Sequence, residues 1–165
     1  MTRWTAVTRA NYVSSTPYNV TDPAIHGFQG THQPAIWMGE SGQCAIQAGV
    51  GEVRPAFSDR GLAFSRDDEE ASATHYRVKM QAGAGQTIVG EHTSTSRVGH
   101  IRYTFDAHQP PFVVLQATRK TVITSNPNNV TDVFGGAVHI DATRQEISGR
   151  NPEWVARPLS YKPNC

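Results

Sequence analysis

The chain is short of cysteine, of charge imbalance and of long apolar runs. Cys44 and Cys165 are the only cysteines among its 165 residues. Because Cys165 is the last residue, where a structural bridge is seldom useful, we expect neither a disulfide nor a cysteine-based metal site. A net charge of +1 without a basic stripe argues against nucleic acid as a partner. No segment approaches the roughly 20 apolar residues of a membrane span, so we expect no membrane partner either.

The first residues lack an apolar segment of the kind found in signal peptides, so we expect no signal peptide in this chain. Two Asn-X-Thr sequons, Asn19-Val-Thr21 and Asn129-Val-Thr131, are weak indications of a secretory history. The length fits one domain over residues 1–165, which would bury roughly 70% of its unfolded surface.

The usual catalytic signatures are also missing. Neither HxH nor HExxH occurs, and His26 and His32 stand six positions apart, so we expect no metal site on this chain. There is no Gly-x-Ser-x-Gly elbow, and the glycines at 83 and 85 fit a hairpin turn better than a phosphate loop. A glycosidase needs two carboxylates across the scissile bond. The candidates, which compete with an interpretation as solvated surface acids, are Glu40, Asp59, the acids at 67–70 and Glu91.

The remaining pattern predicts strands. Residues 74–80 alternate in polarity, with Tyr76, Val78 and Met80 on one face, and residues 98–105 repeat the pattern. We also expect strands over 86–98, 137–140 and 146–148, and a strand buried on both faces over 112–117. The acids of 67–72 suggest a solvated loop or a helix start. Short strands separated by Gly and Pro turns predict an all-β, antiparallel β-sandwich.

Residues 25–42 concentrate the side chains that could form a site. Four glycines and a proline make a helix impossible and a long regular strand unfavourable, so we expect a loop. The loop carries His32, Gln33, Trp37 and Glu40. An aromatic plate beside hydrogen-bonding groups is how proteins hold sugars, because the ring covers C–H faces and the polar groups pair with hydroxyls. The alternative is a surface loop whose tryptophan fills the core.

Several segments, taken together, resemble a known family. Residues 25–42, 61–72, 95–105 and the stretches 140–141 and 149–153 follow one another as in the N-terminal domain of glycoside hydrolase family 92, the calcium-dependent α-mannosidases, and most closely its fungal members. The resemblance extends over roughly residues 18–154. It implies inverting, exo-acting enzymes that remove terminal α-linked mannose in a cleft between an N-terminal β-sandwich and a larger helical domain.

The resemblance also implies roles for individual residues. Segment 32–37 is similar to the loop of members that act on α-1,2-linked mannose, so Trp37 is expected to contact the sugar, with His32 and Gln33 beside it. Glu40 is assigned to holding the loop. The resemblance places the catalytic acid, the base and the calcium ligands mainly on the helical domain, so none is expected here. It implies a secreted enzyme of carbohydrate metabolism and N-glycan processing.

The family's helical domain and its opening strands have no counterpart that we recognise in these residues, and the segment after Trp154 no longer resembles the family. We therefore expect a sandwich incomplete at both ends, from a truncated enzyme. Three interpretations remain open. The chain is a non-catalytic part of an α-1,2-mannosidase, a stand-alone mannose-binding module, or a vestigial product without a ligand. Whether the truncation is biological or a gene-model artefact also stays open.

Overall fold

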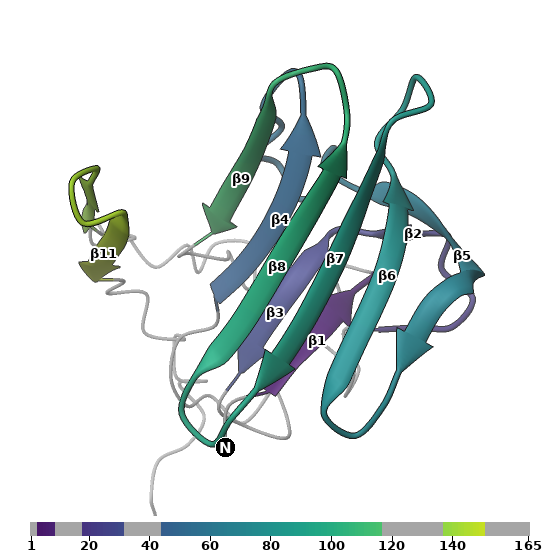
Figure 1. Cartoon of the computed structure of the whole chain (residues 1–165), viewed down its shortest axis with the longest axis horizontal. Helices are drawn as coiled ribbons and strands as arrows, with labels where there is room; N and C mark the ends of the chain where they lie inside the picture. The colour runs from purple at the N-terminus through teal and green to yellow at the C-terminus, as the bar shows by residue number, and fades with distance from the viewer. Residues whose placement is uncertain (1–2, 9–17, 32–43, 117–136, 151–165) are drawn as a thin grey trace, which may run out of the picture.

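The computed structural model describes residues 3–8, 18–31, 44–116 and 137–150, and these residues form strands and turns without a helix (Figure 1). Every strand pair is antiparallel, which confirms the all-β prediction. No helix in these ranges is long and apolar enough to cross a membrane. The strands are β1 (Arg3–Val7), β2 (Ala24–Ile25), β3 (Gly27–Thr31), β4 (Cys44–Val50), β5 (Leu62–Ala71), β6 (His75–Gln81), β7 (Thr87–Ser94), β8 (Gly99–Asp106), β9 (Pro111–Gln116), β10 (Ala137–Asp141) and β11 (Glu146–Arg150).

Two sheets form the sandwich, and Figure 1 shows one lying behind the other. The first has the strand order β1-β3-β4-β9, and the second has the order β2-β5-β6-β7-β8. The strands β10 and β11 pair only with each other, as a hairpin. Because β1 pairs with β3, the first residues of the chain supply a strand to the sandwich.

The core lies between the two sheets and is built around Phe28 of β3. Phe28 is fully buried, and its ring packs against Tyr76, His92 and Tyr103 of the opposite sheet at centroid distances of 6.0, 5.2 and 6.2 Å. Gly90 of β7 leaves room for this ring, since a β-carbon there would lie 3.2 Å from it. The remaining buried core residues are Ala6, Ile25, Ala48, Val78, Met80 and Ile88.

The alternating segments behave as the sequence predicts. In β6, Val78 and Met80 are fully buried and Tyr76 is half-buried on the same face. In β8, residues 101, 103 and 105 face the core, while their neighbours are exposed. The expected hairpin turn at 83–85 joins β6 to β7, where Gln86 donates a backbone hydrogen bond to Gly83 over 2.9 Å.

Three local expectations are wrong. Strand β9 is an edge strand rather than one buried on both faces, with Val113 55% and Leu115 38% exposed. The acids at 67–70 lie inside β5 and form neither a loop nor a helix start. Residues 27–31, expected in a loop, form β3, whose glycines fit between close neighbours: a β-carbon at Gly27 would stand 3.1 Å from the Ile46 carbonyl oxygen.

Candidate functional site

The candidate sugar-binding loop connects two neighbouring strands. Gly30 of β3 pairs with Cys44 of β4, so the connection between the two strands begins and ends at one end of the four-stranded sheet. The side chains predicted to contact substrate (His32, Gln33, Trp37), together with Glu40, lie outside the described residues. Loops at the ends of a sandwich are where such folds carry their binding residues.

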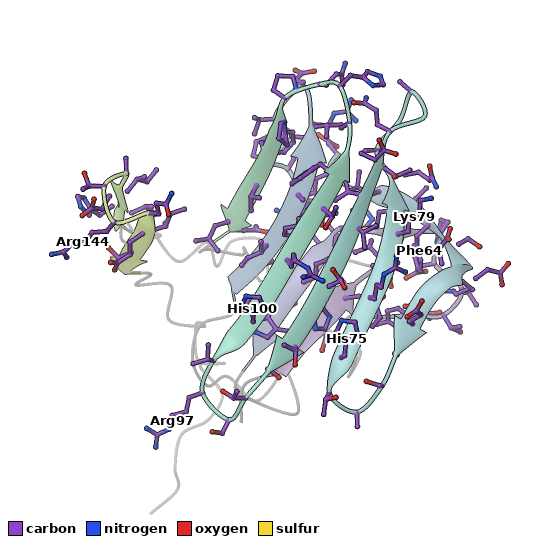
Figure 2. All side chains as sticks on the ribbon, in the orientation of Figure 1. Phe64, His75, Lys79, Arg97, His100 and Arg144 are labelled. Atoms are coloured by element: carbon purple, nitrogen blue, oxygen red, sulfur yellow. The ribbon has the colours of Figure 1, made fainter. Side chains whose placement is uncertain are left out.

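The same end of the sandwich holds a close contact between the sheets. Trp4 of β1 pairs with Gly30, and its ring reaches Gly99 at the start of β8. The turn at 95–98, closed by a 2.8 Å backbone hydrogen bond from Thr95 to Val98, is therefore at this end too. Figure 2 shows Arg97 of this turn projecting away from the sheets. We call this region, formed by Trp4, Gly30, Cys44 and residues 95–98, the loop end.

Two buried nitrogen atoms near the loop end have no hydrogen-bond partner in the part of the chain that is described. They are Nε1 of Trp4 and Nε2 of His92. His92 stacks on Tyr76 at 4.9 Å. Burial, and then the charge of nearby His75, lowers the pKa of His92 from 6.5 to about 4. His92 is therefore a neutral core group at pH 7 and not a proton shuttle.

Two of the candidate carboxylates that the structure describes, Glu70 and Glu91, form ion pairs within the second sheet. Glu91 of β7 lies 2.8 Å from Arg102 and 3.7 Å from His75, and Glu70 lies 3.4 Å from Arg77. These contacts join neighbouring strands on one sheet face, as cross-strand pairs do. Glu70 and Glu91 are thus engaged by cationic side chains of neighbouring strands.

Glu69 has a different role, because a bulge turns it toward the interior. Residues 65–68 of β5 lie opposite Lys79 alone, after which Glu69 pairs with Val78. Its carboxylate accepts hydrogen bonds from Tyr76 (2.5 Å), Tyr18 (2.9 Å) and Arg66 (2.9 Å). Burial raises the pKa of this carboxyl, but the three hydrogen bonds outweigh that effect and the net pKa is lowered. An ionised carboxylate that already accepts several hydrogen bonds stabilises the fold and is unsuited to donate a proton.

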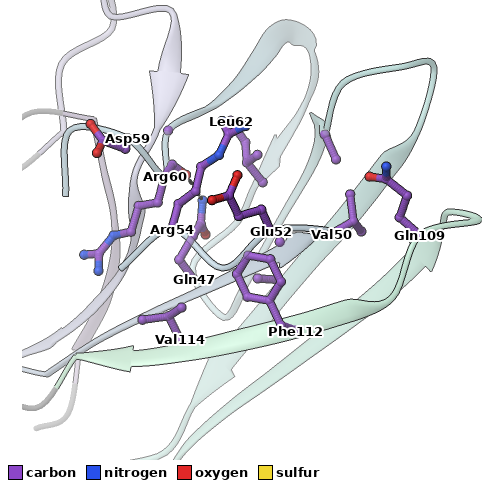
Figure 3. A pocket seen from close by; sticks show the side chains of 14 residues that line it. Gln47, Val50, Glu52, Arg54, Asp59, Arg60, Leu62, Gln109, Phe112 and Val114 are labelled. Atoms are coloured by element: carbon purple, nitrogen blue, oxygen red, sulfur yellow. Dashed lines mark hydrogen bonds between the residues drawn. The ribbon is translucent and has the colours of Figure 1, made fainter. Parts of the chain in front are cut away.

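A pocket lies toward the other end of β4, on the sheet face that is covered by the β4–β5 connection (Figure 3). Its volume is about 310 Å³. Phe112 of β9 lies over Gly49, where a β-carbon would stand 2.2 Å from the ring, and Val114 lies beside it. Polar side chains of both charges complete the lining: Gln47, Glu52, Arg54, Asp59, Arg60 and Gln109.

Gln47 lines this pocket and holds a buried acceptor that no described residue satisfies. The side chain is 2% exposed, and its Nε2 donates to the carbonyl oxygens of Ile25 (3.0 Å) and Arg60 (3.5 Å). Because both partners are acceptors, the nitrogen must face them and Oε1 must face the other way. Gln47 Oε1 is buried and receives no hydrogen bond from the described residues. Such an atom calls for a donor from outside, such as a hydroxyl group or a water molecule.

Sequence reasoning did not identify Gln47 or Trp4. The available signal for Gln47 was a lone amide in the middle of the apolar segment of β4, a position where a strand buries its side chain. No comparable signal marks Trp4, since its contact with Gly99 spans two sheets.

The fold defines the class of protein: an antiparallel β-sandwich in which β3 and β4 are neighbouring strands. The sequence matches the family described as the glycosyl hydrolase family 92 N-terminal domain over residues 1–159, and the chain belongs to this family. The comparison with curated proteins gave no match.

A solved structure supports the same assignment. The chain is similar to the family GH92 inverting mannosidase of Bacteroides thetaiotaomicron VPI-5482, with 29% sequence identity and a TM-score of 0.59 over 70% of this chain. The similarity extends over only 15% of that enzyme's chain. The fold of this region is thus shared, whereas the activity of the whole enzyme belongs to a much longer protein.

Proposed function

We propose that this chain is the substrate-contacting N-terminal domain of an exo-acting, inverting α-1,2-mannosidase that hydrolyses terminal mannose from glycans. The observation that carries the proposal is the family match over residues 1–159, supported by the 29% identity to an inverting mannosidase. The chain is not catalytic by itself in this account. The general acid, the base and the bound calcium are supplied by a helical domain.

Trp37 is the main sugar contact in this proposal, with His32 and Gln33 as hydrogen-bonding neighbours. The position of their connection supports these roles, because β3 and β4 fix both of its ends beside each other at one end of the sandwich. A tryptophan ring covers the C–H face of a pyranose, and an imidazole or amide pairs with its hydroxyls.

Calcium binding is assigned to the helical domain because the resemblance to the family places the calcium ligands mainly there. Calcium takes six to eight oxygen ligands, several of them carboxylates. Among the residues that the structure describes, no three His, Cys, Asp or Glu side chains come together to hold a metal ion.

The experiment that tests this proposal combines the chain with the helical domain of a family 92 mannosidase whose own N-terminal domain has been removed. Proton NMR follows the release of mannose from α-1,2-mannobiose. We expect no hydrolysis by either part alone, and hydrolysis by the complex with β-mannose as the first anomer released, as inversion requires. A folded complex that releases no mannose would overturn the proposal.

A second candidate function, a stand-alone mannose-binding module, is favoured by the pocket around Gln47. Phe112 offers an apolar surface in this pocket, and polar side chains of the lining, Gln109 among them, suit sugar hydroxyls. The lining carries two cationic and two acidic side chains, a balance that suits a neutral ligand: Glu52, Arg54, Asp59 and Arg60.

Titration of the ¹⁵N-labelled chain with α-1,2-mannobiose at millimolar concentration tests the binding module and locates the bound sugar. Binding that is lost in Phe112→Leu and kept in Trp37→Ala would assign the sugar to the pocket. Binding with the opposite dependence would assign it to the loop, and an unchanged spectrum would eliminate the binding module.

A further inference from the structure

One sequence motif plays no part in the mannosidase proposal, the sequon at Asn19. It lies on the connection between β1 and β2, where Asp22 donates a 3.1 Å backbone hydrogen bond to the carbonyl oxygen of Asn19 and closes a turn. Val20 is 66% exposed, and Thr21 is exposed beside it. The sequon is thus presented on a surface turn, where an N-linked glycan needs to be.

Hydrogen bonds to the oxygen of the Asn19 side chain hold this side chain in place, and its amide nitrogen takes no part in them. Its Oδ1 accepts from the Thr21 backbone nitrogen at 2.9 Å and from the Thr21 hydroxyl at 2.8 Å. Its backbone nitrogen donates to Thr8 Oγ1 at 2.8 Å. Within the described ranges, no group accepts a hydrogen bond from Nδ2. A sugar on Nδ2 leaves Oδ1 an amide oxygen, so the turn keeps all of these contacts.

The backbone of the turn is fastened to the edge of the second sheet. Arg66 of β5 donates to the carbonyl oxygens of Asn19 (3.3 Å), Val20 and Asp22 (3.1 Å). Strand β2 pairs with β5 only at residues 62 and 63, so beyond Phe64 the side of β5 that faces away from β6 has no neighbouring strand among the described residues. A glycan on this turn would stand beside that edge and shield it from pairing with another chain.

We propose that Asn19 is an N-glycosylation site and that the donor is an oligosaccharide linked to a lipid diphosphate. In the transfer, the bond from Asn19 Nδ2 to the first sugar's C1 forms as the bond from C1 to the diphosphate oxygen breaks. The diphosphate leaves with the electron pair, and an Nδ2 proton passes to a base of the transferring enzyme. The proposal rests on the secretory location that we infer from the mannosidase assignment.

The test uses a purified single-subunit oligosaccharyltransferase with its lipid-linked donor, so it is independent of mannosidase activity. The folded chain carries Asn129→Gln, which leaves the sequon at 19 as its acceptor. Mass spectrometry before and after treatment with a peptide N-glycosidase reports the site. We expect one glycan at Asn19, retention of the glycan in Thr21→Ser and loss in Thr21→Val, which keeps the side-chain shape but lacks the hydroxyl.

A synthetic peptide of residues 17–23 serves as the reference for enzyme activity. If the peptide receives the glycan and the folded chain does not, the fold hides the sequon and the proposal is overturned. Transfer to the Thr21→Val chain would equally contradict it, because the Thr21 hydroxyl would then have no part in presenting Asn19. Failure of the mannosidase experiment would leave both results unchanged.

Discussion

Trp4 and Gly99 touch across the two sheets so closely that a β-carbon on Gly99 would stand 1.6 Å from Trp4 Nε1. The two residues fasten β1 to β8 at the loop end of the sandwich. Only glycine permits this approach, since any larger residue must displace the indole or a backbone strand.

Gly99→Ala should therefore lower the free energy of unfolding by about 2–3 kcal/mol, the cost of overpacking a close contact. Urea unfolding followed by tryptophan fluorescence measures the change. Val98→Ala is the matched control, because Val98 is 62% exposed in the adjacent turn and its loss should stay within about 0.5 kcal/mol. Equal midpoints for Gly99→Ala and the control would show that Trp4 moves aside freely.

Strands β6 and β9 show which parts of the fold the sequence predicts and which it does not. The alternation at Tyr76, Val78 and Met80 has the period of a strand, so β6 could be predicted from local pattern alone. The position of β9 could not, because a continuous apolar run does not reveal whether the opposite sheet extends far enough to cover both Val113 and Leu115.

The prediction of a loop or helix start at residues 67–72 was wrong for a similar reason. Glu69 is stabilised inside β5 by Tyr18, which stands 51 positions earlier in the chain, and by the bulge that turns it inward. Local propensity carries no information about such distant partners. For the candidate site, the sequence named the residues of the β3–β4 connection, and the structure added that both ends of this connection meet at one end of the sandwich. The sugar contact of Trp37 stays a prediction.

Removal of the Glu69 carboxylate should strongly destabilise the chain. Glu69→Ala leaves the Tyr18 and Tyr76 hydroxyls and the Arg66 guanidinium without their acceptor, at a cost of about 2–3 kcal/mol. Glu70→Ala is the neighbouring control, because the Glu70 side chain is 69% exposed and its pair with Arg77 should contribute less than about 0.5 kcal/mol. Thermal unfolding of both variants compares the two costs, and similar losses would refute the role of the network.

The stability of the chain should fall as the pH is lowered from about 6.5 to about 4. The folded-state pKa of His92 is lowered to about 4, chiefly by burial, whereas the unfolded imidazole titrates near 6.5. Between these values the unfolded chain binds a proton that the folded chain does not, so protonation favours unfolding. Because the ring is only partly buried, we expect a loss of roughly 2 kcal/mol rather than the full value of the shift.

Urea midpoints measured at intervals from pH 7 to pH 4 test this dependence. His92→Phe keeps an aromatic ring against Phe28 and Tyr76 and should flatten the profile across this window. An identical profile for wild type and His92→Phe would assign the pH dependence to another group.

The central claim, that this domain contacts the substrate through Trp37, is tested most directly by Trp37→Ala in the complex with a family 92 helical domain. We predict that kcat/KM for α-1,2-mannobiose falls at least about 30-fold, corresponding to the roughly 2 kcal/mol of a central aromatic contact. The free energy of unfolding of the isolated chain should change by less than about 1 kcal/mol. An unchanged kcat/KM, accompanied by the loss of roughly 3–5 kcal/mol that truncation of a buried aromatic causes, would instead identify Trp37 as a core residue and contradict the account.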